Sequence, residues 1–78
     1  MLLSKLANII CRNGTGSEDI TITVKAYKDG RLLWKGLAKD LKKFTKYNHG
    51  WLVVEVLIDQ NDESNPYDYN KGKIITVI

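Results

Sequence analysis

The sequence predicts a single α+β domain of order αββαββ, in which a four-stranded antiparallel sheet carries two helices packed on one face. Two observations lead to this fold class. Apolar residues recur at helical spacing in two segments, and four other segments alternate or run apolar over strand length. A chain of 78 residues suits one domain, so residues 1–78 are treated as one unit.

The first helix is predicted over residues 2–12, where Leu2, Leu6 and Ile9 recur at helical spacing. The Asn13-Gly14 pair that follows is a helix stop, because glycine tolerates the left-handed conformation of a C-terminal cap. A loop then leads to the first strand.

That strand is predicted over residues 19–27, because apolar and polar residues alternate there. Ile22 and Val24 lie on its apolar face. The sequence Lys28-Asp29-Gly30 predicts a tight turn into a second strand, which ends at Gly36. The two strands should therefore form an antiparallel hairpin.

Two registers of this hairpin are possible. A two-residue loop would place Leu33 and Lys35 on the apolar face of the first strand, whereas a three-residue loop with Gly30 in a bulge would place Leu32 and Trp34 there. Burying an indole in place of an ammonium group stabilises the fold by kilocalories per mole, so the second register is favoured.

The second helix is predicted over residues 37–47, with an apolar face of Leu37, Leu41 and Phe44. The opposite face carries lysines within an arc of about 100° at 3.6 residues per turn. These lysines are Lys39, Lys42, Lys43 and Lys46.

Two strands complete the predicted sheet. Residues 51–58 are apolar on both faces, which is typical of a strand at the centre of a sheet. Residues 60–71 form a polar loop, and residues 73–78 form the last strand after Gly72. If this short strand lies at the sheet edge, its free backbone groups invite a second copy, so a homodimer is expected.

The hairpin of residues 24–36, the short helix that follows it and the strand of residues 51–56 resemble small accessory proteins of phages and prophages. Such proteins begin with a short helix and end on a short apolar strand, as this chain does. The resemblance implies a virus-borne or mobile-element origin. It also implies a non-enzymatic role in inhibiting host machinery or a defence system, in the manner of anti-CRISPR proteins.

Catalysis and metal binding find little support in the sequence. Cys11 and His49 are the only residues of their types, and each has a simpler role in a helix or a helix stop. A calcium loop starting at Asp59 would need glycine and glutamate where Ser64 and Asn70 stand. We therefore expect no enzyme activity, no cofactor and no metal.

Two surfaces are candidates for partners. The long acidic loop with its tyrosines suits a host or defence-system protein, since tyrosine supplies contact area at little cost in entropy. Its candidate residues are Asp62, Glu63, Tyr67, Asp68 and Tyr69. The alternative is a nucleic-acid interface of Lys35, Lys39, Lys42, Lys43 and Lys46, which would neutralise backbone phosphates. A small-ligand-binding protein stays open as a third class.

Composition gives weaker guidance on location. A single cysteine cannot form an internal disulfide, which favours the reducing cytoplasm, here that of the host cell. The apolar N-terminal stretch is broken by Lys5 and Arg12, so we expect neither a signal peptide nor a membrane anchor. A net charge of +3 permits an acidic partner without requiring one.

Overall fold

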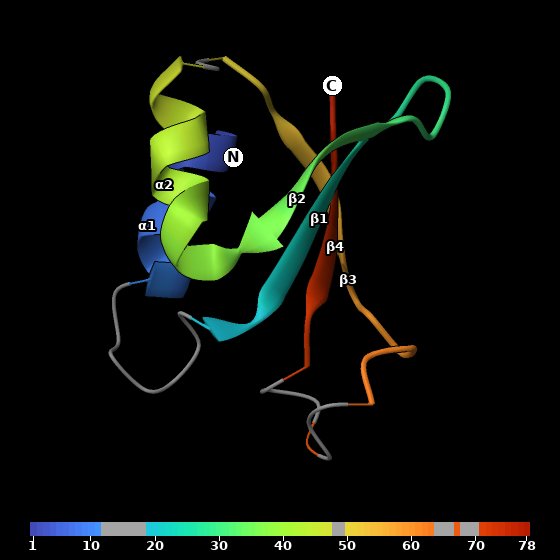
Figure 1. The fold of residues 1–78 in the computed structure, drawn as a ribbon. Helices are drawn as coiled ribbons and strands as arrows, with labels where there is room; N and C mark the ends of the chain where they lie inside the picture. Colours follow the sequence, from blue (N-terminus) through green and yellow to red (C-terminus); the bar gives the residue numbers. More distant parts are fainter. Residues whose placement is uncertain (12–18, 48–49, 64–66, 68–70) are drawn as a thin grey trace.

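The computed structural model describes residues 1–11, 19–47, 50–63, 67 and 71–78. The α+β class and the order of the elements are confirmed. Figure 1 shows these elements, which are α1 (Leu3–Cys11), β1 (Thr21–Ala26), β2 (Leu32–Leu37), α2 (Ala38–Tyr47), β3 (Val53–Ile58) and β4 (Lys73–Val77).

The sheet is mixed, so the prediction of an all-antiparallel sheet is wrong. Its strand order is β2-β1-β4-β3, and the two central strands, β1 and β4, run parallel. The outer pairs, β1 with β2 and β3 with β4, are antiparallel. The parallel pair arises because β4 enters between β1 and β3 instead of adding to an edge.

The predicted central position of residues 51–58 is also wrong, and the edge position considered for the last strand is not found. β4 is central, and its Ile75 and Val77 are buried, whereas β3 lies at an edge with most of its side chains exposed. Apolar residues on both faces of β3 therefore reflect exposed apolar surface and not a central position. The expected homodimer through an edge-lying last strand loses its structural basis, because both backbone edges of β4 are paired within the chain.

The β1–β2 hairpin places Trp34 opposite Val24, as the favoured register predicts. The loop is longer than predicted: the N–H of Gly30 donates to the C=O of Ala26, and the Ala26 N–H donates to the C=O of Arg31, both at 2.9 Å. Gly30 has a φ of 69°, which favours glycine. A bulge between Val24 and Lys25 in the pairing then restores the register of Trp34.

The same bulge corrects the position of Leu32. Leu32 pairs with Lys25 and is exposed, while the inserted Leu33 is half-buried and packs on the core. Placing Leu32 on the apolar face of β1 was therefore wrong, because a longer loop shifts the start of β2 by one residue.

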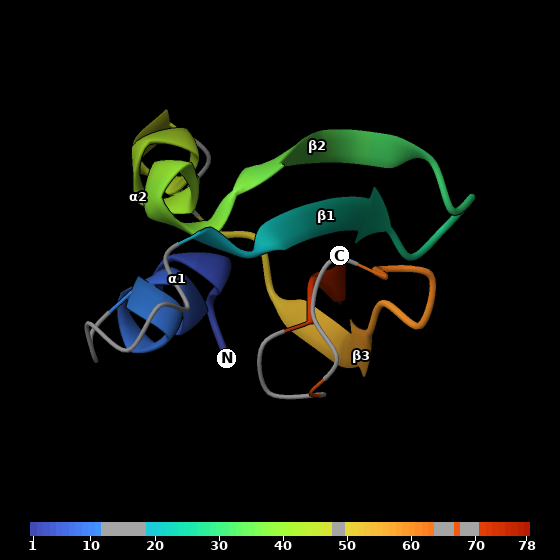
Figure 2. The same ribbon diagram turned by 60° about the horizontal axis from the view of Figure 1, so that its bottom comes forward.

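One buried cluster joins the sheet to residues of both helices. Ile22, Val24, Ile75 and Val77 come from the central strands. α1 contributes Leu3 and Ala7, and α2 contributes Ala38 and Leu41. Each large side chain buried in this way stabilises the fold by roughly 1.5–3 kcal/mol. Figures 1 and 2 show α1 and α2 side by side, next to the sheet.

The N-terminal residues extend the sheet at its β3 edge. Leu2 forms an antiparallel bridge with Leu52, the N–H of Leu3 donates to the C=O of Trp51 at 2.9 Å, and the N–H of Val53 donates to the C=O of Met1 at 2.7 Å. The start of β3 is therefore paired on both sides, while its remaining length has a neighbour only in β4. Among the described residues, no helix has the length and apolarity to cross a bilayer.

Candidate functional site

The two faces of the sheet differ in what they carry. We define the inner face by Ile22, Val24 and Ile75, which are fully buried, and by Trp34, whose indole stacks on Phe44 of α2. Successive side chains of a strand alternate between faces. The outer face therefore carries the residues between them, which are Thr23, Lys25, Lys35, Glu55, Leu57, Ile74 and Thr76.

An apolar row crosses one end of the outer face. Leu52 and Ile78 exchange two backbone hydrogen bonds of 3.0 and 2.9 Å, and Leu52 bridges Leu2 on its other side. Residues directly opposite one another in antiparallel strands place their side chains on the same face. Leu2, Leu52 and Ile78 thus form a continuous apolar row, and they are 43%, 46% and 62% exposed.

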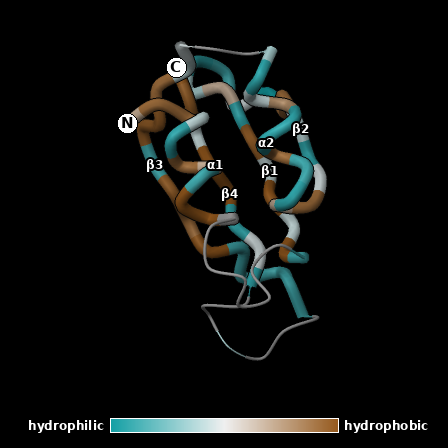
Figure 3. The backbone as a smooth tube through the Cα atoms, turned by 90° about the vertical axis from the view of Figure 1, so that its left-hand side faces the viewer, coloured by the Kyte–Doolittle hydropathy of each residue, from teal (hydrophilic) through white to brown (hydrophobic). Residues whose placement is uncertain are grey.

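Leu57 adds to this apolar surface farther along β3. It lies beside Ile74 on the outer face and is 50% exposed. Figure 3, in which the backbone is coloured by the hydropathy of each residue, shows hydrophobic residues along β3 and at the N-terminus. Exposed apolar side chains that gather on one face often mark an interaction site.

Charged side chains lie on the same face as the apolar row. Lys35 pairs with Thr23, and Lys25 lies two residues along β1, so the two ammonium groups are diagonal neighbours on the outer face. Glu55 pairs with Thr76, which itself lies beside Lys25. The outer face therefore combines exposed leucine and isoleucine side chains with two lysines and one glutamate.

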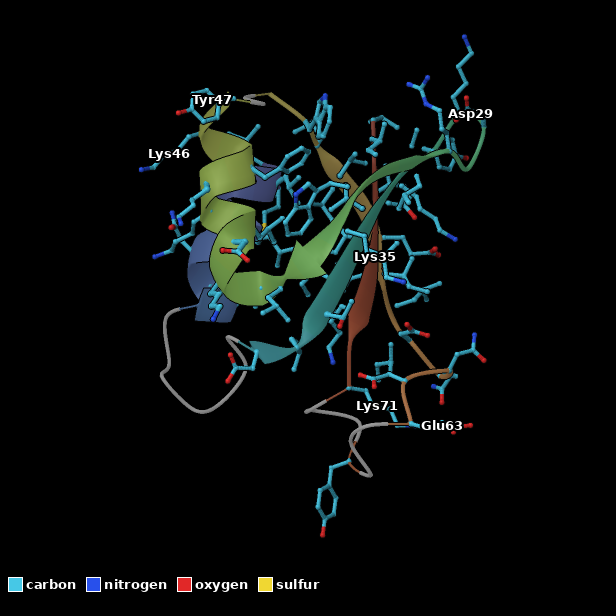
Figure 4. The ribbon with its side chains drawn as sticks, viewed as in Figure 1. Asp29, Lys35, Lys46, Tyr47, Glu63 and Lys71 are labelled. Carbon is cyan, nitrogen blue, oxygen red and sulfur yellow. The ribbon has the colours of Figure 1, made fainter. Side chains whose placement is uncertain are left out.

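The acidic loop is placed only in part. Glu63 and Tyr67 are exposed, and Tyr67 exposes 59% of its surface. Asp68 and Tyr69 lie outside the described residues. Figure 4 shows Glu63 near the end of the molecule where β3 and β4 are connected.

Asp62 has a structural role in this loop. Its Oδ2 accepts a 2.7 Å hydrogen bond from the Gly72 N–H, and its own N–H donates to the C=O of Asp59 at 3.1 Å. The Asp59 N–H donates to the C=O of Gly72 at 2.8 Å, which ties the two ends of the loop together. Because its carboxylate is half-buried and engaged, Asp62 is a poorer candidate for partner contact than Glu63.

The predicted lysine surface divides into two parts. Lys39, Lys42, Lys43 and Lys46 are all exposed on α2, opposite the buried residues Ala38, Leu41 and Thr45, which confirms the predicted arc. Lys35 does not join them, because it lies on the outer face while α2 contacts Trp34 on the inner face. Figure 4 shows Lys46 at the end of α2 and Lys35 over the sheet.

An open groove between the two helices collects two of these lysines. Its lining residues are Ser4 and Asn8 of α1 and Lys42, Thr45 and Lys46 of α2. We call this groove the polar seam. Ser4 and Asn8 are four residues apart, so both lie on one side of α1. This spacing is present in the sequence, but it indicates a groove only when α2 is known to lie beside it.

Of the two residues considered for catalysis, only one lies within the described part of the chain. Cys11 ends α1, and His49 lies outside the described residues. Within the part of the chain that the structure describes, no group of three or more histidine, cysteine or acidic residues is placed to hold a metal ion.

In the comparisons with known proteins, no family model, no curated protein and no solved structure matches the chain.

Proposed function

We propose that this chain is a small non-enzymatic protein-binding protein that docks on its partner with the outer face of the sheet. In this proposal both helices cover the inner face and leave the outer face for the partner. The partner is a host or defence-system protein that the chain inhibits in the host cytoplasm, in the manner of phage accessory proteins.

The observation that supports this proposal is the apolar row, which lies on the same face of the sheet as Lys25 and Lys35. Exposing Leu2, Leu52 and Ile78 to water brings no benefit to the fold, whereas burying them against a partner removes apolar surface from solvent. Lysines on the same face as such a row steer an acidic partner and set its orientation. The favoured partner surface therefore combines apolar side chains with carboxylates.

A second copy of the chain fits the outer face less well. A symmetric face-to-face pair would bring the same lysines of both copies toward one interface, where like charges repel. A foreign acidic surface meets no such repulsion.

Site-specific photo-crosslinking tests the proposal. A photoreactive phenylalanine analogue at position 57 would report on the outer face, and the same analogue at position 47 would serve as the control, because Tyr47 is 86% exposed on α2. We expect crosslinks to a distinct bacterial protein from position 57 and not from position 47. Crosslinks only between copies of the chain, crosslinks from position 47 alone, or none at all would overturn the proposal.

The crosslinked protein, once purified, allows a quantitative test, with affinity measured by calorimetry and the association rate by stopped-flow mixing. We expect Leu52→Asp to weaken its affinity at least tenfold, because a carboxylate would replace an apolar contact. The double change Lys25→Glu and Lys35→Glu should slow association. Lys39→Glu with Lys43→Glu alters the net charge equally on α2 and should leave the rate much closer to that of the parent. Equal slowing by both pairs would show that overall charge, and not the outer face, guides binding.

A further inference from the structure

The polar seam between α1 and α2 joins cationic and neutral hydrogen-bonding groups from two helices. Lys42 and Lys46 are four residues apart, so their ammonium groups emanate from positions about 6 Å apart along the helix axis. Ser4 and Asn8 face them with a hydroxyl and a side-chain amide at the same spacing. The groove between them has a volume of about 490 Å³.

The floor of the polar seam is polar as well. Thr45 is buried, and its Oγ1 donates a 3.0 Å hydrogen bond to the C=O of Lys42, which holds its side chain in place. None of the described residues that line the groove carries a carboxylate. The lining therefore carries two positive charges and no negative charge, and this composition suits an oxyanion better than an apolar group or a cation.

We propose that the polar seam binds phosphate groups. Lys42 and Lys46 supply the charge, and Ser4 and Asn8 supply hydrogen-bond donors from the opposite helix. Lysine binds phosphate as a point charge without the paired geometry of arginine, so binding depends on salt and is not specific for base sequence. The phosphates belong either to a nucleic-acid backbone or to a free nucleotide, which offer the same chemistry.

The geometry separates this site from a general lysine surface. Lys39 and Lys43 are exposed on the same helix but do not line the groove. They therefore provide a matched control, since changing either pair of lysines removes two positive charges from α2. The seam and the outer face also lie on different elements, so failure of one proposal leaves the other standing.

Fluorescence anisotropy with a labelled twelve-nucleotide oligothymidylate at low salt tests the proposal. Single strands contribute a slope of about 0.7 per phosphate neutralised, so two lysines predict a slope of log affinity against log salt of about −1.4. We expect Lys42→Gln with Lys46→Gln to weaken binding at least tenfold and to flatten this slope. Lys39→Gln with Lys43→Gln should retain most of the affinity.

Two further measurements complete the test. Asn8→Asp would introduce a carboxylate into the seam and should weaken binding, while Asn61→Asp makes the same charge change in an exposed loop and should not. Competition by ATP with the same lysine dependence would assign the seam to free nucleotides, and binding of the oligonucleotide alone would assign it to a nucleic-acid backbone. Equal weakening by both lysine pairs, or no binding of either probe by the folded parent chain, would overturn the proposal.

Discussion

The indole of Trp34 in β2 stacks on the phenyl ring of Phe44 in α2, with ring centroids 5.2 Å apart and an angle of 19° between the planes. The ring of Phe44 also packs against the indole of Trp51, with ring centroids 5.5 Å apart and the ring planes tilted by 55°. These three rings tie α2 to the sheet at the point where the hairpin bulge fixes the position of Trp34.

Removing the indole should therefore destabilise the fold strongly. We expect Trp34→Ala to lower the free energy of unfolding by roughly 3–5 kcal/mol through the cavity that it leaves. A double-mutant cycle with Phe44→Ala should give a coupling of about 0.5–1.5 kcal/mol from the ring contact. Urea melts measure both quantities, and Tyr47→Ala on the exposed side of α2 is the control. A melt of Trp34→Ala that overlays the parent would contradict the assigned hairpin register.

Gly36 is required by the same indole. A Cβ atom at this position would lie 2.7 Å from Cζ2 of Trp34, so the ring would have to move away from its contacts. We expect Gly36→Ala to cost about 1–3 kcal/mol, as overpacking does elsewhere. In a Trp34→Leu background most of this cost should disappear. A penalty of the same size in both backgrounds would show that the indole is not its cause.

The strand order predicts a large difference between two apolar substitutions. Ile75 is fully buried in the central strand β4, whereas Val54 is 45% exposed at the bulge of β3. We expect Ile75→Ala to cost roughly 2–5 kcal/mol in denaturant melts and Val54→Ala less than about 1 kcal/mol. Similar costs for the two would indicate that β3 is more deeply buried than its edge position implies.

The carboxylate of Asp62 should stabilise the β3–β4 connection. Asp62→Ala removes the acceptor of the Gly72 N–H, and leaving a part-buried donor without a partner costs about 1–3 kcal/mol. Hydrogen exchange at the Gly72 amide should become faster, while the exposed neighbour Glu63, changed to alanine, should leave it unaltered. Unchanged exchange in Asp62→Ala would show that the bond contributes little.

Local patterns predicted the elements well. The lysine arc of α2 follows from helical spacing alone, and the position of Trp34 follows from the alternation of β1 together with the energetic gain of burying an indole. Both depend on residues close together in the chain, so the sequence carries the necessary information.

The strand order and the outer face could not be predicted in this way. Val24 pairs with Ile75 across about two thirds of the chain, and no short-range pattern specifies which strand enters between β1 and β3. The apolar row depends on the same choice, because Leu2, Leu52 and Ile78 become neighbours only once β4 lies beside β3. For β3, an apolar composition on both faces predicted burial, but an edge strand with exposed leucine and valine has the same composition.

The central position of β4 also determines when the chain can fold during synthesis. β1 and β2 can pair as soon as both have left the ribosome, because a short loop connects them. β3 joins this hairpin only through β4, which follows it in the chain and must first emerge and pair with β1. Until β4 pairs, the apolar residues of β3 beyond Val53 lack their neighbour in the sheet, and in this interval the chain is most exposed to aggregation.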